Sequence, residues 1–135
     1  MGFVSNEVRL NGKGFLDKEY YLSSFEQVFI KENTNAVLYT VPHCKIGKTE
    51  ILNEFAYITT FTYPYIEDII WVTSYKMQEH IGNKVIDVNQ VQQWKAERTD
   101  NRLFIVDDMT LVNPNFAKFM DFLYSHQAKV IGFVI

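Results

Sequence analysis

Short runs of β-branched and apolar residues alternate with longer segments of helical period along most of this chain. The runs that fit buried strands are residues 36–41, 68–73, 85–88, 103–106 and 129–134. The segments that fit helices are residues 48–60, 74–82, 89–97 and 114–126. Such alternation is typical of α/β proteins, because a crossover helix must carry the chain back between parallel strands. We therefore expect a three-layer α/β sandwich around a mostly parallel sheet.

The N-terminal part of the chain follows a less regular pattern than the rest. The Asn-Gly-Lys-Gly sequence at residues 11–14 predicts a turn. Ser23 followed three positions later by Glu26 forms a capping box, which predicts a short helix from there to about residue 32. We therefore expect an N-terminal extension with a short helix over residues 1–34 and a core over residues 35–135.

Composition and charge limit the classes of partner. The chain has 13 Lys and Arg against 16 Asp and Glu, and both signs are scattered, so no basic stripe predicts a general nucleic-acid binder. The longest apolar run, about five residues, is far below the roughly 20 that a membrane span needs. A single cysteine excludes an internal disulfide and a multi-cysteine metal site. We expect a cytoplasmic protein without a membrane span.

Residues 38–50 are the most informative segment for chemistry. They run from a β-rich stretch through a loop that ends in Gly47-Lys48-Thr49 and into an amphipathic helix. A phosphate-binding P-loop needs this context: backbone N–H groups around the phosphates, a lysine, a hydroxyl for Mg²⁺ and a helix N-terminus. We therefore assign nucleotide binding to Gly47, Lys48 and Thr49, with Thr49 also a metal ligand. Pro42 replaces the first glycine of the motif, which makes this P-loop degenerate.

A second motif lies roughly 55 residues further along the chain. The apolar run of residues 103–106 ends in Asp107 and Asp108, the form of a Walker B segment. In such segments the first carboxylate holds Mg²⁺ and the second polarises the attacking water. We therefore predict Asp107 as a metal residue and Asp108 as a catalytic residue. Together the two motifs predict a P-loop NTPase that uses Mg²⁺ and ATP or another nucleoside triphosphate.

Residues 35–135 resemble the superfamily 1 helicases of positive-strand RNA viruses and the related triple-gene-block movement proteins of plant viruses. The loop reads Val-Pro at 41–42, then Cys44, then Gly-Lys-Thr at 47–49. It is similar to the family's Val-Pro-Gly-Cys-Gly-Lys-Thr loop with two residues inserted. Residues 103–133 are similar to motifs II and III of these families, with a strand, two acids, a helix and a second apolar strand after a basic residue.

The resemblance implies a RecA-like P-loop core and a nucleic-acid partner. In such a core the strand at residues 129–134 lies between the P-loop strand and the Asp107 strand, all of them parallel. Residues 70–74 fall where motif Ia contacts the nucleic-acid backbone. The resemblance therefore implies single-stranded RNA as a partner, contacted by Thr73, Ser74 and Lys76.

This chain departs from the family at three motif positions. Besides Pro42, Asp108 stands where the family has glutamate, and Gly132 is followed by Phe133 where the family has aspartate. The helicases also carry an arginine finger and later motifs on a second RecA-like domain. The resemblance therefore covers the N-terminal RecA-like half only, and turnover is expected to need a second RecA-like domain or a protein partner.

Three functions follow from these motifs. The first is an NTP-binding and NTP-hydrolysing helicase-like domain of a viral RNA replication or movement protein, located in the host cytoplasm. A phage or plasmid ATPase for DNA packaging or replication shares the same two motifs and stays open. A non-catalytic module with a degenerate P-loop also stays open, favoured by Pro42 and by the 16% of aromatic residues.

Several other reactive or aromatic residues carry little weight. The three histidines are too scattered along the sequence to predict a metal site, and Cys44 has no visible catalytic partner. Tyr57, Phe61, Tyr63 and Tyr65 are suited to stacking on bases, but packing and protein contacts are expected of them at these spacings.

Overall fold

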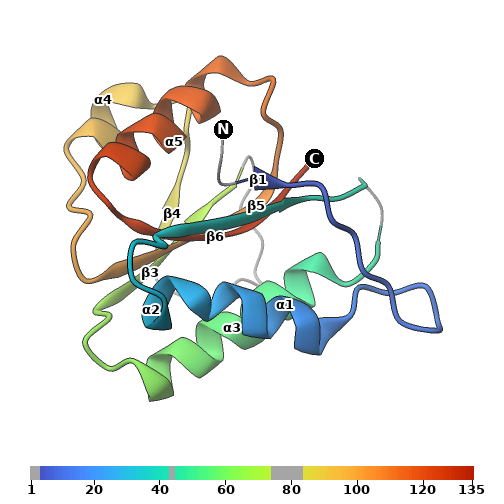
Figure 1. Ribbon diagram of the computed structural model, residues 1–135. Helices are drawn as coiled ribbons and strands as arrows, with labels where there is room; N and C mark the ends of the chain where they lie inside the picture. The colour runs from blue at the N-terminus through green and yellow to red at the C-terminus, as the bar shows by residue number, and fades with distance from the viewer. Residues whose placement is uncertain (1–3, 43–44, 74–83) are drawn as a thin grey trace.

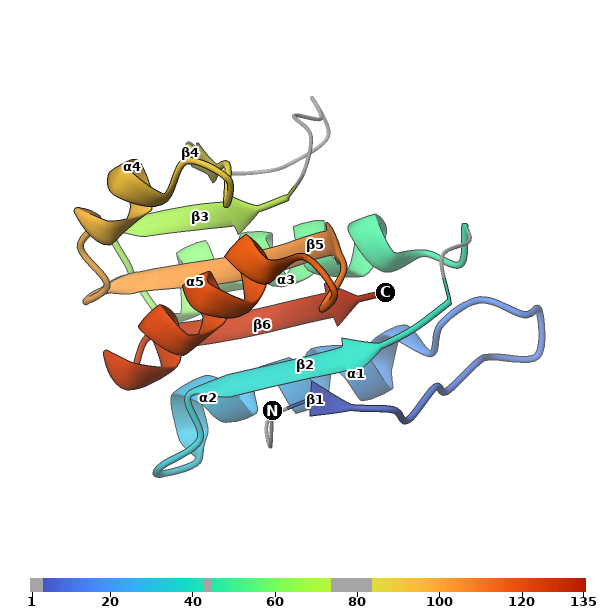
Figure 2. The ribbon, with the colours of Figure 1, turned by 90° about the horizontal axis from the view of Figure 1, so that it is seen from above.

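The apolar runs of the sequence lie side by side in one parallel sheet. The computed structural model describes residues 4–42, 45–73 and 84–135. The strands of the described residues are β1 (Val4–Ser5), β2 (Ala36–Thr40), β3 (Asp68–Val72), β4 (Lys84–Ile86), β5 (Arg102–Met109) and β6 (Lys129–Val134). Their order is β1-β2-β6-β5-β3-β4, every neighbouring pair is parallel, and Figure 2 shows the arrows pointing the same way.

Helices cover both faces of this sheet. In the described residues they are α1 (Lys18–Phe25), α2 (Gln27–Ile30), α3 (Lys48–Thr62), α4 (Val91–Lys95) and α5 (Pro114–Ser125). Helices α1, α2 and α3 lie on one face, and α4 and α5 lie on the other (Figure 1). The expected three-layer α/β arrangement is confirmed, with a sheet that is parallel throughout.

Each face of the sheet has its own apolar core, because successive side chains of a strand point to opposite faces. The core beside α1, α2 and α3 includes Tyr21, Phe25, Phe55, Ile105 and Phe133. The core beside α4 and α5 includes Trp94, Phe104, Phe116, Phe119 and Val130. Strands β5 and β6 contribute to both cores, which explains why their sequences are apolar at nearly every position.

The central strand order agrees with the expectation for the last strand. Strand β6 lies between β2 and β5, with Ile131 in register with Val37 on one side and Ile105 on the other. Strand β2, which precedes the Gly-Lys-Thr loop, and strand β5, which carries the two acids, are therefore separated by one strand. Because all three are parallel, their carboxyl ends meet at the same edge of the sheet.

The N-terminal residues complete the sheet and one core. Strand β1 pairs with β2, and the predicted turn at 11–14 is confirmed by an antiparallel bridge between Leu10 and Leu16. The predicted capping box is wrong: Ser23 lies inside α1, which begins at Lys18. Tyr21 and Phe25 lie one turn apart and are both fully buried. Their packing on the core therefore determines where α1 lies, and it outweighs the local capping signal.

Other boundaries differ from expectation at the ends of elements. Strand β5 continues three residues past the predicted end at 106, and β4 is shorter than predicted. Helix α4 occupies only part of the predicted 89–97 segment, and the helix predicted over 74–82 lies outside the described residues. Over the described ranges, no helix has both the length and the apolar character needed to cross a membrane.

Candidate functional site

The loop between β2 and α3 brings the Gly-Lys-Thr sequence to the carboxyl edge of the sheet. Val41 N donates to Val134 O at 2.9 Å, which ties the start of this loop to the end of β6. Gly47 is the N-cap of α3 and has φ of 96°, a left-handed conformation that favours glycine. Lys48 and Thr49 are then the first two residues of α3, which begins on the side of the arrowheads in Figure 2.

The two motifs meet through their side chains. Thr49 Oγ1 donates a hydrogen bond to Asp107 Oδ2 at 3.0 Å. Lys48 Nζ lies 3.6 Å from Asp108 Oδ1 and donates to Pro42 O at 3.3 Å. The structure therefore brings Lys48, Thr49, Asp107 and Asp108, the residues of the two sequence motifs, together at one edge of the sheet.

A β-bulge presents both acids to the loop. Val106 is in register with Gly132 and Met109 with Val134, so Asp107 and Asp108 stand opposite the single residue between them on β6. Asp108 has φ of 62°, which is unusual for a residue other than glycine. In a regular strand two successive side chains would point to opposite faces. The bulge instead allows Asp107 to contact Thr49 while its neighbour contacts Lys48.

Gly132 makes this bulge sterically feasible. Its φ is 150°, and a Cβ added to it would lie 2.2 Å from Val106 O and 2.8 Å from Val106 N. No side chain fits against backbone atoms at that distance. Gly132, which the resemblance placed at the end of motif III, thus has a packing function in this structure. It lets β6 approach β5 immediately before the two acids.

The charged groups of the site are largely shielded from solvent. Asp107 is 1% exposed, and the side chains of Lys48 and Asp108 are 10% and 18% exposed. Opposite charges in such surroundings attract more strongly than on an open surface, and each compensates for the desolvation of the other. An anion that binds Lys48 must therefore compete with Asp108.

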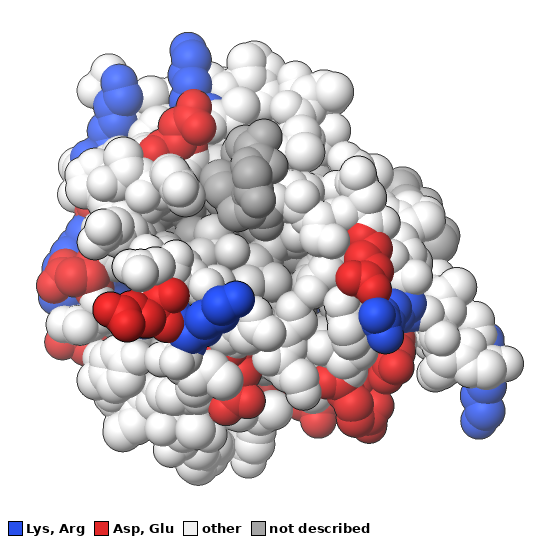
Figure 3. Space-filling model, viewed as in Figure 1, with Lys and Arg blue, Asp and Glu red and all other residues white. Residues whose placement is uncertain are grey.

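The predicted nucleic-acid residues are only partly described. Thr73 follows β3, and its side chain is 2% exposed, while Ser74 and Lys76 lie outside the described residues. Figure 3 shows basic and acidic side chains interspersed on the face it presents, with the blue residues standing apart from one another. A nucleic-acid contact by Thr73, Ser74 and Lys76 remains a prediction.

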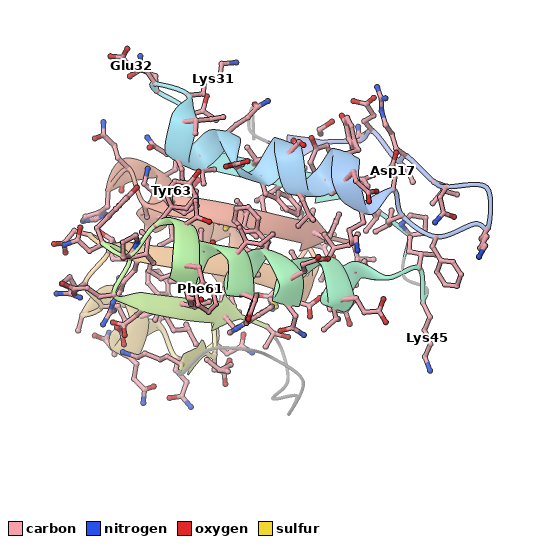
Figure 4. The ribbon with its side chains drawn as sticks, turned by 90° about the horizontal axis from the view of Figure 1, so that it is seen from below. Asp17, Lys31, Glu32, Lys45, Phe61 and Tyr63 are labelled. Carbon is pink, nitrogen blue, oxygen red and sulfur yellow. The ribbon has the colours of Figure 1, made fainter. Side chains whose placement is uncertain are left out.

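The N-terminal turn packs against the loop that precedes α3. Leu16 N donates to Ile46 O at 2.9 Å, one residue before Gly47. A pocket of about 260 Å³ lies between the turn and the first turn of α3, and is lined by Asn11, Phe15, Leu16, Lys18, Ile46, Gly47, Glu50 and Ile51. Lys45, on the same loop, is exposed and extends away from the helices (Figure 4). The sequence motifs do not predict these contacts, because the motifs begin at residue 38 and the turn lies before them.

The aromatic residues near the end of α3 divide into packed and exposed groups. The Tyr63 ring stacks on Phe29 with a centroid separation of 3.9 Å, and its hydroxyl donates to Glu26 Oε1 at 2.8 Å (Figure 4). Burial, reinforced by this hydrogen bond, raises the pKa of Tyr63 to about 12. The expected packing is confirmed for Tyr63. Tyr57 and Phe61 are 56% and 71% exposed, with ring centroids 4.9 Å apart.

Comparisons with other proteins do not assign a function to this site. No family model matches the chain, and no match is found among curated proteins or solved structures. In the part of the chain that the structure describes, no three His, Cys, Asp or Glu side chains gather into a metal-binding group. The four residues at the sheet edge are therefore the feature of this protein that points to a function.

Proposed function

We propose that this protein binds a Mg²⁺–nucleoside triphosphate at the carboxyl edge of its sheet, as a RecA-like P-loop NTPase domain. The observation that carries the proposal is the 3.0 Å hydrogen bond from Thr49 to Asp107, which joins residues 58 positions apart. A P-loop site requires two oxygen ligands for its metal ion: a hydroxyl on the first turn of a helix, and a carboxylate near the end of a neighbouring strand.

The residues present fit a Mg²⁺ ion in their chemistry. Mg²⁺ prefers hard oxygen ligands, and in phosphate sites it takes one or two protein groups together with phosphates and water. Thr49 Oγ1 and Asp107 Oδ2 are such oxygens, held on separate elements within hydrogen-bonding distance. When bound, Mg²⁺ would neutralise phosphate charge and polarise the bond to the terminal phosphate.

The side chains of this protein then have distinct roles. Lys48 binds the terminal phosphates, and the N-terminus of α3 directs backbone N–H groups toward them. Asp108 orients and polarises the attacking water. Before nucleotide binds, Asp108 is the ion-pair partner of Lys48, so phosphate binding also releases Asp108 for that second role.

The strand order supports a RecA-like core over other P-loop arrangements. P-loop proteins of the additional-strand class have one strand between the P-loop strand and the Walker B strand, and β6 occupies that place here. On this basis we propose an NTP-binding, slowly hydrolysing helicase-like domain of a viral RNA replication or movement protein. Efficient turnover requires an arginine finger from a second domain or partner, because that group supplies roughly 10³–10⁵ in rate where it acts.

Equilibrium binding of MgATP to wild type and to Lys48→Ala, measured by calorimetry, tests the proposal. Wild type should bind in a Mg²⁺-dependent manner, and Lys48→Ala should weaken affinity roughly 10- to 100-fold, since a charge-assisted contact is lost. Lys45→Ala is the matched control, because Lys45 is an exposed lysine of the same loop. Equal affinity of Lys48→Ala and wild type, with both variants folded by circular dichroism, would refute a phosphate role for this lysine.

The helicase-like domain and the alternative functions predict different effects of RNA and DNA on the rate of ATP hydrolysis. A helicase-like RNA domain should hydrolyse ATP faster with single-stranded RNA than with DNA. A DNA-packaging or replication ATPase should show the reverse preference. Binding of MgATP without detectable hydrolysis under either condition, even with a candidate partner present, is the behaviour of the non-catalytic module.

A further inference from the structure

One buried hydroxyl next to the strand of the two acids lacks a hydrogen-bond partner among the described residues. Thr73 is 2% exposed, and its Oγ1 makes no hydrogen bond within the described residues. Buried hydroxyls in native proteins nearly always have a partner, because leaving one without any is costly. Thr59 illustrates the usual case: it is 0% exposed, and its Oγ1 donates to Phe55 O at 2.8 Å. Thr73 therefore needs an explanation that Thr59 does not.

The register of β3 and β5 predicts that Thr73 lies beside Asp107, with both side chains on the same side of the sheet. Val72 is in register with Val106, and Thr73 and Asp107 are the residues that follow them. Adjacent strands are about 4.8 Å apart, and residues in register point to the same face. Val72 and Val106 belong to the core on the α5 side, so the alternation of a strand predicts that the next residues point to the α3 side. Thr49 of α3 contacts Asp107 from that side.

We propose that Thr73 is a positioning residue of the Mg²⁺–nucleotide site, and that its hydroxyl hydrogen-bonds a water molecule of the ion's hydration shell. This inference rests on the proposed function. Mg²⁺ dehydrates reluctantly and keeps several waters in phosphate sites, so oxygens around it are needed to hold those waters as well as the ion. A hydroxyl beside the metal-binding carboxylate can both donate to and accept from such a water.

The burial of Thr73 is consistent with this role. Thr73 and Asp107 are 2% and 1% exposed, so they are enclosed to the same extent. A hydrated ion bound at Asp107 would therefore bring water molecules close to the Thr73 hydroxyl. A side chain so enclosed is poorly placed to contact a nucleic-acid strand lying on the protein surface, which is the role that the family resemblance implies for this position.

Three variants test the proposal. Thr73→Val removes the hydroxyl and keeps the shape, Thr73→Ser keeps the hydroxyl, and Thr59→Val is the matched control at a buried threonine whose hydroxyl is already bonded. Calorimetry should measure affinity for MgATP and for ATP with EDTA. We expect Thr73→Val to weaken MgATP binding roughly tenfold, the effect of one lost hydrogen bond, with metal-free ATP affinity unchanged. Thr73→Ser and Thr59→Val should stay near wild type.

Thermal unfolding without nucleotide supplies an independent readout. Because Thr73→Val removes a buried hydroxyl that has no protein partner among the described residues, it should unfold at the same temperature as wild type or higher. Thr59→Val, which loses a hydrogen bond, should not be stabilised. A destabilised Thr73→Val would show that the hydroxyl is structural and would overturn the proposal.

The binding outcomes separate this inference from the proposed function. Wild type that binds MgATP while Thr73→Val binds it equally well overturns the role of Thr73 alone. Equal weakening of MgATP and metal-free ATP by Thr73→Val also overturns it, since the effect would not involve the ion. Wild type that fails to bind MgATP overturns the proposed function and this inference together.

Discussion

At the scale of single residues, the site is defined by two side-chain pairs that share one sheet edge. In the first pair, the oxygens of Thr49 and Asp107 are suited to bind a metal ion. In the second pair, the Lys48 ammonium group is paired with the Asp108 carboxylate. The function that we propose requires phosphate to displace Asp108 from Lys48, while Thr49 and Asp107 stay side by side. In the structure, Asp108 neutralises Lys48 and holds it at the sheet edge.

Asp108→Asn tests the competition between phosphate and Asp108 for Lys48. We expect this variant to bind MgATP at least as tightly as wild type, because Lys48 no longer has a competing carboxylate, while ATP hydrolysis falls. Calorimetry and a phosphate-release assay measure the two effects. Weaker binding by Asp108→Asn than by Asp107→Asn would contradict the assignment of the metal to Asp107 and of the water to Asp108.

At the scale of elements, the bulge of β5 is the feature that builds the site. It depends on the close approach of Gly132 to Val106, where an added Cβ would lie 2.2 Å from a backbone oxygen. Backbone atoms at this position are fixed by pairing on both sides of β6. Stability and site geometry are therefore coupled through one glycine.

Gly132→Ala should destabilise the protein by about 3 kcal/mol, because the new methyl group must push β5 and β6 apart. MgATP affinity should fall as well, because Val106, the residue that the new methyl group displaces, directly precedes Asp107 and Asp108 on β5. Gly12→Ala is the control: an added Cβ there meets nothing within 4 Å, so stability should change by less than about 0.5 kcal/mol. Equal urea midpoints for the two variants would show that the bulge tolerates a side chain.

Elements whose local and tertiary signals agree could be predicted from the sequence. The bounds of β6 match the prediction, because its run is apolar on both faces. Helix α5 begins as predicted, after Asn113, whose side chain accepts hydrogen bonds from Asn115 N and Phe116 N. The start of α1 could not be predicted in this way: Ser23 fits a cap locally, but burial of the aromatic residues around it extends the helix past that point.

The candidate site was predictable in its residues but not in its geometry. Spacing and residue type identified Lys48, Thr49, Asp107 and Asp108. No sequence pattern predicts the bulge, because the extra residue of β5 is defined only by its register with β6. The unbonded hydroxyl of Thr73 depends likewise on three-dimensional enclosure, which no local pattern encodes.

At the scale of the whole molecule, the N-terminal residues are part of the core that supports the site. Tyr21 and Phe25 are 0% exposed, and their rings lie 5.2 and 5.4 Å from the ring of Phe133 on β6. Leu16 N also donates a hydrogen bond to Ile46 O in the loop before α3. Without these residues, Phe133 would lose packing partners in the core that α1 and α3 share.

A chain of residues 35–135 alone tests the division into an N-terminal extension and a core. We expect it to lack a cooperative unfolding transition, because the loss of buried aromatic side chains costs about 3–5 kcal/mol for each, close to the total stability of a small domain. Thermal unfolding followed by circular dichroism makes the comparison with the full chain. A sharp transition together with MgATP binding would show that residues 35–135 are an independent core.

The central claim, that one edge of the sheet holds the metal and the nucleotide together, is tested most directly by NMR with Mn²⁺–ATP as a paramagnetic probe. Amide signals of residues 47–49 and 107–109 should broaden first as the probe is added. Signals of Asn35 and Gln127, which precede β2 and β6 at the opposite edge, should stay sharp. Broadening centred on the opposite edge, or none at saturating Mn²⁺–ATP, would contradict the account.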